Sequence, residues 1–257
     1  MNIENKKKIV DSLKISFLKA GETSLLLRKQ GLTKEIKSDG TPVTNGDLEV
    51  NKIITNSIKK LTSEIPIVSE ESSLNKSSKN LNCFWLIDPI DGTHDYINNK
   101  EEFTLNASLI INNIPEIGIV YAPAKKRLFY TYEKNFSFEI INNHEKKLDC
   151  KKITRKGEVK AVSYSDKLKP IIEEFHKKFK VTSFIKMKSS LKFCVVATGE
   201  YDLYVAEPRA CEWDIAAGHA ILKNAGGIIT DFLGSEILYG KKDFKNPSLI
   251  LKRSNIL

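Results

Sequence analysis

The stretch WLIDPIDGTHDY, residues 85–96, determines how the rest of the chain is interpreted. Asp88 and Asp91 stand three residues apart, and the apolar run at 84–87 that precedes them predicts a strand. One explanation for the pair is a simple turn, because Pro, Asp and Gly are the residues that turns favour. The other is a metal site, in which the strand delivers two carboxylates to its end.

Length and composition predict a folded globular chain. It has 257 residues, of which 41% are hydrophobic, which suits one large domain or two closely packed subdomains and excludes global disorder. The N-terminal stretch is charged and no apolar run is as long as a membrane span, so we expect neither a signal peptide nor a transmembrane segment. The cysteines show no CxxC pairing and indicate reduced thiols in a cytoplasmic protein: Cys83, Cys150, Cys194 and Cys211.

The formal net charge of +9 raises the alternative of a nucleic-acid-binding protein. The lysines are spread over the chain and form no single basic tract, which favours a solvated, lysine-rich surface. We therefore expect no nucleic-acid partner. A positive field also suits a small polyanionic substrate, and the lysines leave open a loose attachment to the inner membrane surface.

Periodicity divides the chain near residue 150. Before that point, apolar residues spaced for helices cover 4–28 and 47–61, a loop covers 37–47, and strands follow at the IPIVS, FWLID, FTLNASLIIN, EIGIVYAP, RLFYTYE and FSFEII stretches. This half predicts helices packed on an antiparallel sheet. We expect subdomains at 1–149 and 150–257.

The second half alternates strands with helices, which predicts an α/β layer. The strands are expected at VKAVSYS, near 181–187, at 202–206 and at GIITDF, and the helices at 167–179, at 190–199 and over WDIAAGHAILKNAGG. The glycines at the end of the last helix give it a stop signal.

Acidic residues stand at the ends of several predicted elements. Glu70 and Glu71 are equally compatible with an ordinary solvated loop, Asp214 with a helix N-cap, and Asp47 with a capping box begun by Thr44. Considered together with the DxxD pair, they match the oxygen ligands that Mg²⁺ prefers. Two such ions can clamp the attacking and leaving oxygens of a phosphoryl transfer.

The backbone around the DxxD pair adds to this hypothesis. The Ile90 carbonyl lies between the two aspartates, and the N–H groups of Gly92 and Thr93 lead into a predicted helix start, where a phosphate can bind. The residues therefore indicate a site for a phosphate ester.

At this point the motifs resemble a known family. The DPIDGT stretch, the SEES loop before it and EWDIAAGHAILKNAGG far downstream are similar to the Mg²⁺-dependent, lithium-sensitive phosphatases of the inositol monophosphatase family. The resemblance runs from about residue 37 to residue 230 and implies a layered αβαβα sandwich with the site between its two halves.

Within the family, the chain resembles the 3′(2′),5′-bisphosphate nucleotidases of sulfur assimilation. KSDGTPVTNGD, GTHDYINNKEEFTLNASLI and SSLKFCVVATGEYDLY carry this likeness. The implied reaction is hydrolysis of adenosine 3′,5′-bisphosphate to AMP and phosphate. The alternative is an inositol monophosphatase or another sugar-phosphate phosphatase, which shares the metal residues. We expect a monomer or a homodimer.

The resemblance also implies roles for individual residues. One Mg²⁺ would be held by Glu70, Asp88 and the Ile90 carbonyl, and a second by Asp88, Asp91 and Asp214. Glu71 would support a third, weaker ion. Thr93, hydrogen-bonded to Asp47, would orient and help deprotonate the attacking water. These expectations are completed by the substrate-binding set: Glu70, Ile90, Asp91, Gly92, Thr93, Ser190, Lys192 and Asp214.

The chain departs from the family pattern at a few positions. Gly46 replaces the usual Ala, and His94 and Asp95 replace a Lys-Glu pair. His94 keeps a cation near the phosphate only when it is protonated, and an ordinary surface histidine explains it equally well. His219, inside the AAGHA helix, is expected to serve packing and not to be a ligand.

Overall fold

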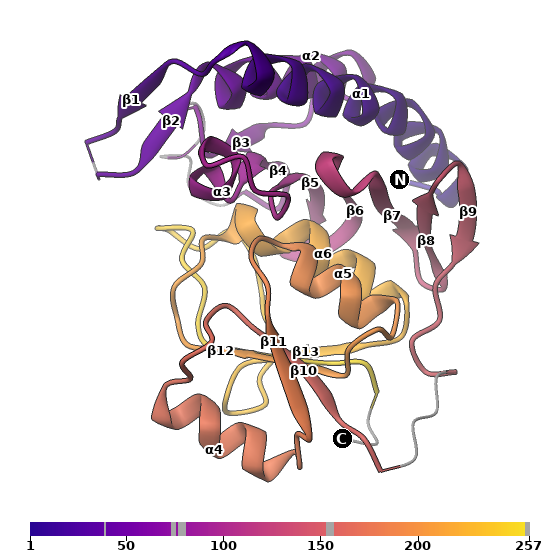
Figure 1. Cartoon of the computed structure of the whole chain (residues 1–257). Helices are drawn as coiled ribbons and strands as arrows, with labels where there is room; N and C mark the ends of the chain where they lie inside the picture. The colour runs from indigo at the N-terminus through magenta and orange to yellow at the C-terminus, as the bar shows by residue number, and fades with distance from the viewer. Residues whose placement is uncertain (39, 73–75, 77–80, 153–156, 255–257) are drawn as a thin grey trace.

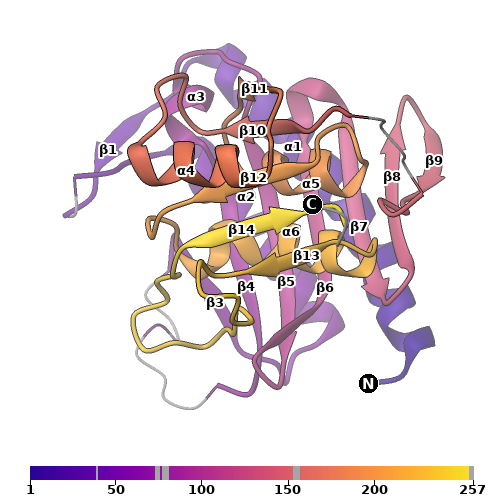
Figure 2. The same ribbon diagram turned by 90° about the horizontal axis from the view of Figure 1, so that it is seen from below.

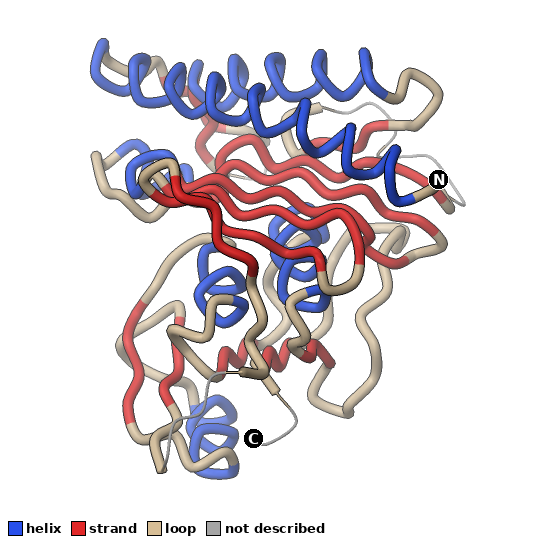
Figure 3. Tube along the Cα trace, turned by 90° about the vertical axis from the view of Figure 1, so that its right-hand side faces the viewer, coloured by secondary structure: helices blue, strands red, loops and turns tan. Residues whose placement is uncertain are grey.

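The computed structural model describes residues 1–257 with the exception of 39, 73–75, 77–80, 153–156 and 255–257. Asp39, within the predicted 37–47 loop, lies outside the described residues. Five layers are stacked in the order helices, sheet, helices, sheet, helix (Figure 1), and the tube view shows the same layers from the side (Figure 3). The predicted α/β class and αβαβα sandwich are confirmed.

The outer helical layer consists of α1 (Ile3–Gln30) and α2 (Asn45–Leu61). Both form because apolar residues recur every three or four positions and face the sheet. Of the apolar positions that the helical spacing predicts, Leu61 is partly buried and the others are buried: Ile9, Leu13, Phe17, Ala20, Val50, Ile54 and Ile58. Each helix begins slightly earlier than predicted.

The first sheet has seven strands in the order β3-β4-β5-β6-β7-β8-β9. β3 pairs in parallel with β4 and the other neighbours are antiparallel, so the expected antiparallel sheet has one parallel pair. The strands are β3 (Ile67–Ser69), β4 (Cys83–Asp91), β5 (Thr104–Ile111), β6 (Ile114–Ala122), β7 (Arg127–Glu133), β8 (Phe136–Ile141) and β9 (His144–Lys147). The 3₁₀ turn η1 (Pro123–Lys125) joins β6 to β7.

Three short strands of the first half were not predicted. The stretch expected to be a loop at 37–47 contains β2 (Pro42–Thr44), which pairs antiparallel with β1 (Lys34–Ile36) in a separate two-stranded ribbon. β9 is exposed at every position, so it has no apolar alternation for a sequence pattern to reveal.

The second sheet has five strands in the order β11-β10-β12-β14-β13 and is mixed. Figure 2 shows these strands from below, with α4 (Pro170–Lys178) over them. The helix begins later than predicted because Pro170 takes its first position. The strands are β10 (Lys160–Ser163), β11 (Ser183–Lys186), β12 (Leu203–Ala206), β13 (Ile228–Thr230) and β14 (Leu249–Lys252); β14 was not predicted.

The middle layer consists of α5 (Leu191–Ala197) and α6 (Glu212–Asn224). α6 contacts five strands of the first sheet, β4 to β8, and also β13 of the second. One hydrophobic cluster runs from Phe84 in the first sheet through Ile221 of α6 to Leu251 in the second. The two sheets therefore share a core through α5 and α6. None of the described helices is long and apolar enough to cross a membrane.

Candidate active site

The DxxD stretch combines a strand with a turn. β4 does not end at Asp88 as predicted but continues to Asp91, with a register shift against β5 between these two residues. Such an irregularity re-aims side chains next to it. Gly92 follows with φ of 93°, and a Cβ there would lie 3.0 Å from the Glu102 carbonyl oxygen, so only glycine fits. The chain then enters α3 (Thr93–Ile97), the helix start that was predicted.

Three of the predicted metal ligands lie together at this point. Ligand atoms of Glu70, Asp88 and Asp214 lie within 4.8 Å of one another. Asp88 is almost fully buried, and its Oδ1 has no hydrogen-bond partner among the described residues. A buried, unpaired carboxylate oxygen is costly unless a cation neutralises it. The oxygen-only donor set suits a hard divalent cation.

The carboxylates of this cluster carry like charges and repel one another. Burial raises the pKa of Asp88 well above its usual range, and the charges of Glu70, Asp91 and Asp214 add to the effect. Burial likewise raises the pKa of Asp214, with Asp91 and Glu70 contributing. Like charges held together without a cation destabilise each other, so the site is built to gain a cation.

Asp91 lies outside the three-residue cluster and faces a pocket. Its carboxylate accepts a hydrogen bond from the Ser190 N–H, which reaches it from the other half of the chain. Burial raises the pKa of Asp91 to about 6, and the positive charge of Lys192 acts in the opposite direction. Asp91 and Asp214 both line the pocket, so the pocket opens onto the acidic cluster.

The SEES loop is not an ordinary solvated loop. The Glu71 side chain is only 6% exposed, and that of Glu70 is 27% exposed. Lys37, from the segment between β1 and β2, pairs with both of them, at 2.6 Å from Glu71 and 3.1 Å from Glu70. Glu71 therefore lies next to the cluster and is bound by a lysine.

Asp47 serves two purposes that the sequence presented as alternatives. Its Oδ2 accepts from the Thr44 N–H at 2.9 Å, which completes the predicted capping box at the start of α2. Its Oδ1 lies 3.1 Å from the Thr93 hydroxyl, and the same hydroxyl lies 3.1 Å from the Ile90 carbonyl oxygen. Burial raises the pKa of Asp47. The predicted contact between Asp47 and Thr93 is confirmed.

Asp214 is not the N-cap of its helix. The cap is Cys211, and Asp214 is the third residue of α6, where its Oδ2 accepts from the Cys211 N–H at 2.8 Å. The first turn of the helix therefore sets the position of the carboxylate.

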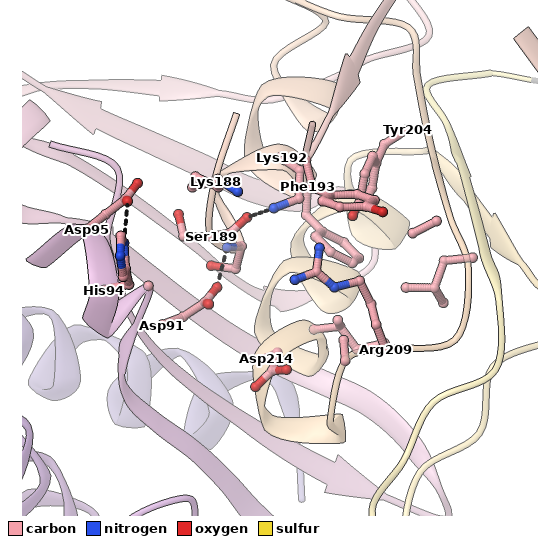
Figure 4. A pocket seen from close by; sticks show the side chains of 17 residues that line it. Asp91, His94, Asp95, Lys188, Ser189, Lys192, Phe193, Tyr204, Arg209 and Asp214 are labelled. Carbon is pink, nitrogen blue, oxygen red and sulfur yellow. Dashed lines mark hydrogen bonds and ion pairs between the residues drawn. The ribbon is translucent and has the colours of Figure 1, made fainter. Parts of the chain in front are cut away.

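The pocket next to the acids has a volume of about 300 Å³. Figure 4 shows Asp91 and Asp214 on one side of it and Lys188, Lys192 and Arg209 on the other. None of the three cations forms an ion pair with a carboxylate in the part of the chain that the structure describes.

The predicted pocket residues Ser190 and Lys192 both line this pocket. Lys192 donates to the Ser189 carbonyl, and burial lowers its pKa to about 8. The Ser190 hydroxyl is turned toward the first sheet, where it lies 2.8 Å from Thr104 Oγ1 and 2.5 Å from Asn106 Oδ1. The backbone of Ser190 therefore binds Asp91, and its side chain contacts residues of the first sheet.

Several lining residues were missed from the sequence. Arg209 lies on the loop between β12 and α6, and its guanidinium stacks 4.3 Å from the Tyr164 ring centre. Lys188 Nζ lies 6.0 Å from the same ring. The available signals were the position of Lys188 directly before the SSLKFC stretch and that of Arg209 five residues before Asp214.

The structure shows the neighbours of Gly46, His94 and His219. A Cβ at Gly46 would lie 2.4 Å from the Tyr96 hydroxyl oxygen, so the tyrosine occupies the space of the usual alanine. His94 is 81% exposed at the pocket rim, 3.5 Å from Asp95. His219 is buried, with Nδ1 2.9 Å from the Tyr239 hydroxyl, and burial lowers its pKa to about 3. Its predicted packing position is confirmed.

Comparisons with known proteins agree with this geometry. The model of the inositol monophosphatase family matches residues 8–255. The chain is 35% identical over 204 residues to the 3′(2′),5′-bisphosphate nucleotidase CysQ of Buchnera aphidicola, covering 79% of this chain and 76% of that protein. It is 33% identical to the CysQ nucleotidase of Salmonella typhimurium, covering 82% and 85%. The crystal structure of CysQ from Bacteroides thetaiotaomicron superposes with a TM-score of 0.78 at 27% identity, covering 98% of each chain.

Proposed function

This chain belongs to the inositol monophosphatase family, and on that premise we propose that it is a 3′(2′),5′-bisphosphate nucleotidase that hydrolyses the 3′-phosphate of adenosine 3′,5′-bisphosphate to give AMP and phosphate. The relatives named as bisphosphate nucleotidases, at 30–35% identity over most of the chain, support this reaction. Inositol phosphates and other sugar phosphates are the alternative substrates, and a comparison of phosphate release distinguishes them.

One observation carries the choice of a bisphosphate. Lys188, Lys192 and Arg209 bring three cations into a pocket that begins at Asp91 and Asp214. A substrate whose first phosphate sits at the acids can place a second phosphate among these cations. A monophosphorylated sugar would leave them without an anion, and charge-assisted bonds are the strong ones.

The aromatic residues of the pocket suit a nucleoside between the two phosphates. Tyr164, Phe193 and Tyr204 line the same cavity. Such rings supply apolar area and planar faces on which a base can stack. Inositol carries hydroxyl groups around its whole ring and has no planar face to stack on these aromatic rings.

We propose that the acidic residues hold Mg²⁺ as the family resemblance implies. Glu70, Asp88 and the Ile90 carbonyl would hold one ion, Asp88, Asp91 and Asp214 a second, and Glu71 a third, weaker one. The close approach of Glu70, Asp88 and Asp214 supports this assignment. When bound, Mg²⁺ lowers the pKa of a coordinated water and offsets the charge of the phosphate.

The protein's own residues then orient the water and the phosphate. Asp47 accepts the Thr93 hydroxyl proton, which leaves an Oγ1 lone pair to accept a proton from the attacking water. Burial of Asp47, which raises its pKa, makes it a better proton acceptor. The first N–H groups of a helix have no partner within it, so those of Gly92 and Thr93 are available to the phosphate.

The thiols support a cytoplasmic location for this enzyme. All four cysteines are free, and two of them, Cys150 and Cys194, are buried. Attachment to the inner membrane surface and the choice between monomer and homodimer remain predictions, which lipid co-sedimentation and light scattering can address.

The test is phosphate release with Mg²⁺ from adenosine 3′,5′-bisphosphate, 3′-AMP, inositol 1-phosphate and fructose 1,6-bisphosphate, with and without Li⁺. We expect preference for the nucleotide bisphosphate and inhibition by Li⁺. Arg209→Met should raise KM for the bisphosphate on the order of tenfold or more and leave KM for 3′-AMP unchanged, because only the second phosphate loses a charged partner. Lys186→Met, at an exposed lysine that pairs with Asp166, is the control.

Preference for inositol phosphate would refute the proposed substrate, while the proposed metal site would stand. An equal loss for both nucleotides in Arg209→Met would refute the placement of the second phosphate.

A further inference from the structure

Asp214 is the member of the acidic cluster that comes from the second half of the chain. Its carboxylate is bound to the first turn of α6, so its distance from Glu70 and Asp88 depends on where that turn lies. The like charges of these residues push the turn away from the first sheet until a cation binds. Something in the second half must hold the turn in place.

A loop of the second half, residues 239–246, surrounds this turn. The Glu212 N–H donates to the Phe244 carbonyl at 2.7 Å, and the Asn246 N–H donates to the Ala210 carbonyl at 3.0 Å. The rings of Trp213 and Phe244 pack 5.8 Å apart. The backbone where the turn begins, at Ala210 and Glu212, is therefore attached to one loop.

The Glu212 side chain makes the strongest attachment. It is fully buried and accepts from the Gly240 N–H at 2.7 Å, the Lys241 N–H at 3.0 Å and the Lys241 ammonium at 2.7 Å. A buried carboxylate is costly unless donors satisfy it, and here three donors come from the same loop. The Glu212 carboxylate is not needed to cap the start of α6, because Asp214 already accepts from the Cys211 N–H.

The spacing on the helix separates the two acids. Residues i and i+2 of a helix do not face each other, so Glu212 can hold the loop while Asp214 faces the cluster. We propose that Glu212 is a positioning residue, which ties the first turn of α6 to loop 239–246 and so holds Asp214 at the metal site. This inference rests on the proposed metal-dependent phosphatase function.

The test measures Mg²⁺ binding to the whole protein by isothermal titration calorimetry, together with thermal stability in EDTA. Glu212→Gln keeps the shape but has only one accepting oxygen, so its N–H₂ group faces either the Gly240 N–H or the Lys241 donors and that part of the attachment to the loop is lost. We expect the Mg²⁺ dissociation constant to rise at least tenfold. Lys241→Met removes one donor and leaves the two backbone bonds, and should raise the constant about threefold.

Asp202→Asn is the matched control. Asp202 is also a fully buried acid of the second half; it accepts from the Lys160 N–H at 2.7 Å and from Arg253, on the second sheet. Its replacement should lower thermal stability and leave the Mg²⁺ dissociation constant unchanged.

Three outcomes would overturn the inference. If Glu212→Gln and Asp202→Asn lose stability alike and both bind Mg²⁺ like the wild type, Glu212 is structural only. If Glu212→Gln does not fold, an unchanged Mg²⁺ dissociation constant in Lys241→Met also means that Glu212 is structural only. A wild-type protein that binds no Mg²⁺ would overturn the proposed function and this inference together, whereas normal wild-type binding with no nucleotide hydrolysis would refute the proposed reaction alone.

Discussion

Asp91→Asn should stabilise the metal-free protein while it abolishes the phosphatase. Burial raises the pKa of Asp91 from its ordinary value of 3.8 to about 6. At about 1.4 kcal/mol per pKa unit, holding this carboxylate charged in the folded state costs about 3 kcal/mol at pH 8. Asparagine removes that charge and can still accept the Ser190 N–H through its amide oxygen. The free energy of unfolding in EDTA should therefore rise by up to about 3 kcal/mol.

The pH dependence has a definite sign. An acid whose pKa is raised by folding stabilises the folded state when protonated, so that contribution is present near pH 4 and is lost as the pH rises through about 6. Asp88 and Asp214, whose pKa values are also raised, act in the same direction. The wild type in EDTA should lose stability between pH 4 and pH 8, and Asp91→Asn should lose less.

Urea denaturation with EDTA and with Mg²⁺, at pH 4.5 and pH 8, measures this difference. In EDTA at pH 8 the variant should be the more stable protein, and in Mg²⁺ the order should reverse because the wild type gains binding energy. Asp166→Asn, at a side chain that is 75% exposed, is the control and should leave the stability unchanged both in EDTA and in Mg²⁺. A variant less stable than the wild type in EDTA at pH 8, or a wild type that gains stability with pH, would refute the reasoning.

Three further predictions follow from local contacts. Gly46→Ala should cost about 1–3 kcal/mol in urea unfolding, because the new methyl group overlaps the Tyr96 ring; an unchanged midpoint would contradict the tight contact. Thr93→Val should lower kcat on the order of 10²–10⁴-fold with normal thermal stability, because the hydroxyl between Asp47 and the water is lost; near-normal turnover would remove Thr93 from the proposed chemistry. Cys194 should react with Ellman's reagent only after unfolding, because burial raises its pKa and shields it.

The long elements could be predicted because their patterns are strong. Helices α1 and α2 show a continuous apolar face, and β4 and β5 are apolar runs of strand length. The short strands β1 and β9 are exposed throughout, and pairing with a neighbour creates them. β14 is a four-residue apolar run, which periodicity cannot assign to strand or helix.

The acidic residues of the site can be recognised from the sequence more readily than its basic residues. Asp88 and Asp91 stand in a motif whose turn residues make them conspicuous, and Asp214 lies in the first turn of a recognisable helix. Arg209 and Lys188 are two among 41 basic residues, and their only local signals are their positions near Asp214 and the SSLKFC stretch. The tertiary arrangement, which brings the β11–α5 and β12–α6 loops beside Asp91, identifies them as pocket residues.

The position of α6 between the sheets has a consequence for synthesis on the ribosome. The first sheet is complete at Lys147, but the helix that covers its inner face begins only at Glu212, 65 residues later. At about 5–20 residues per second, that segment takes on the order of 3–13 s to emerge. During this interval the nascent chain carries an uncovered apolar sheet face. We therefore expect fragment 1–150 to bind a hydrophobic dye and to aggregate, and full-length translation to benefit from a chaperone that shields the nascent chain until α6 is made.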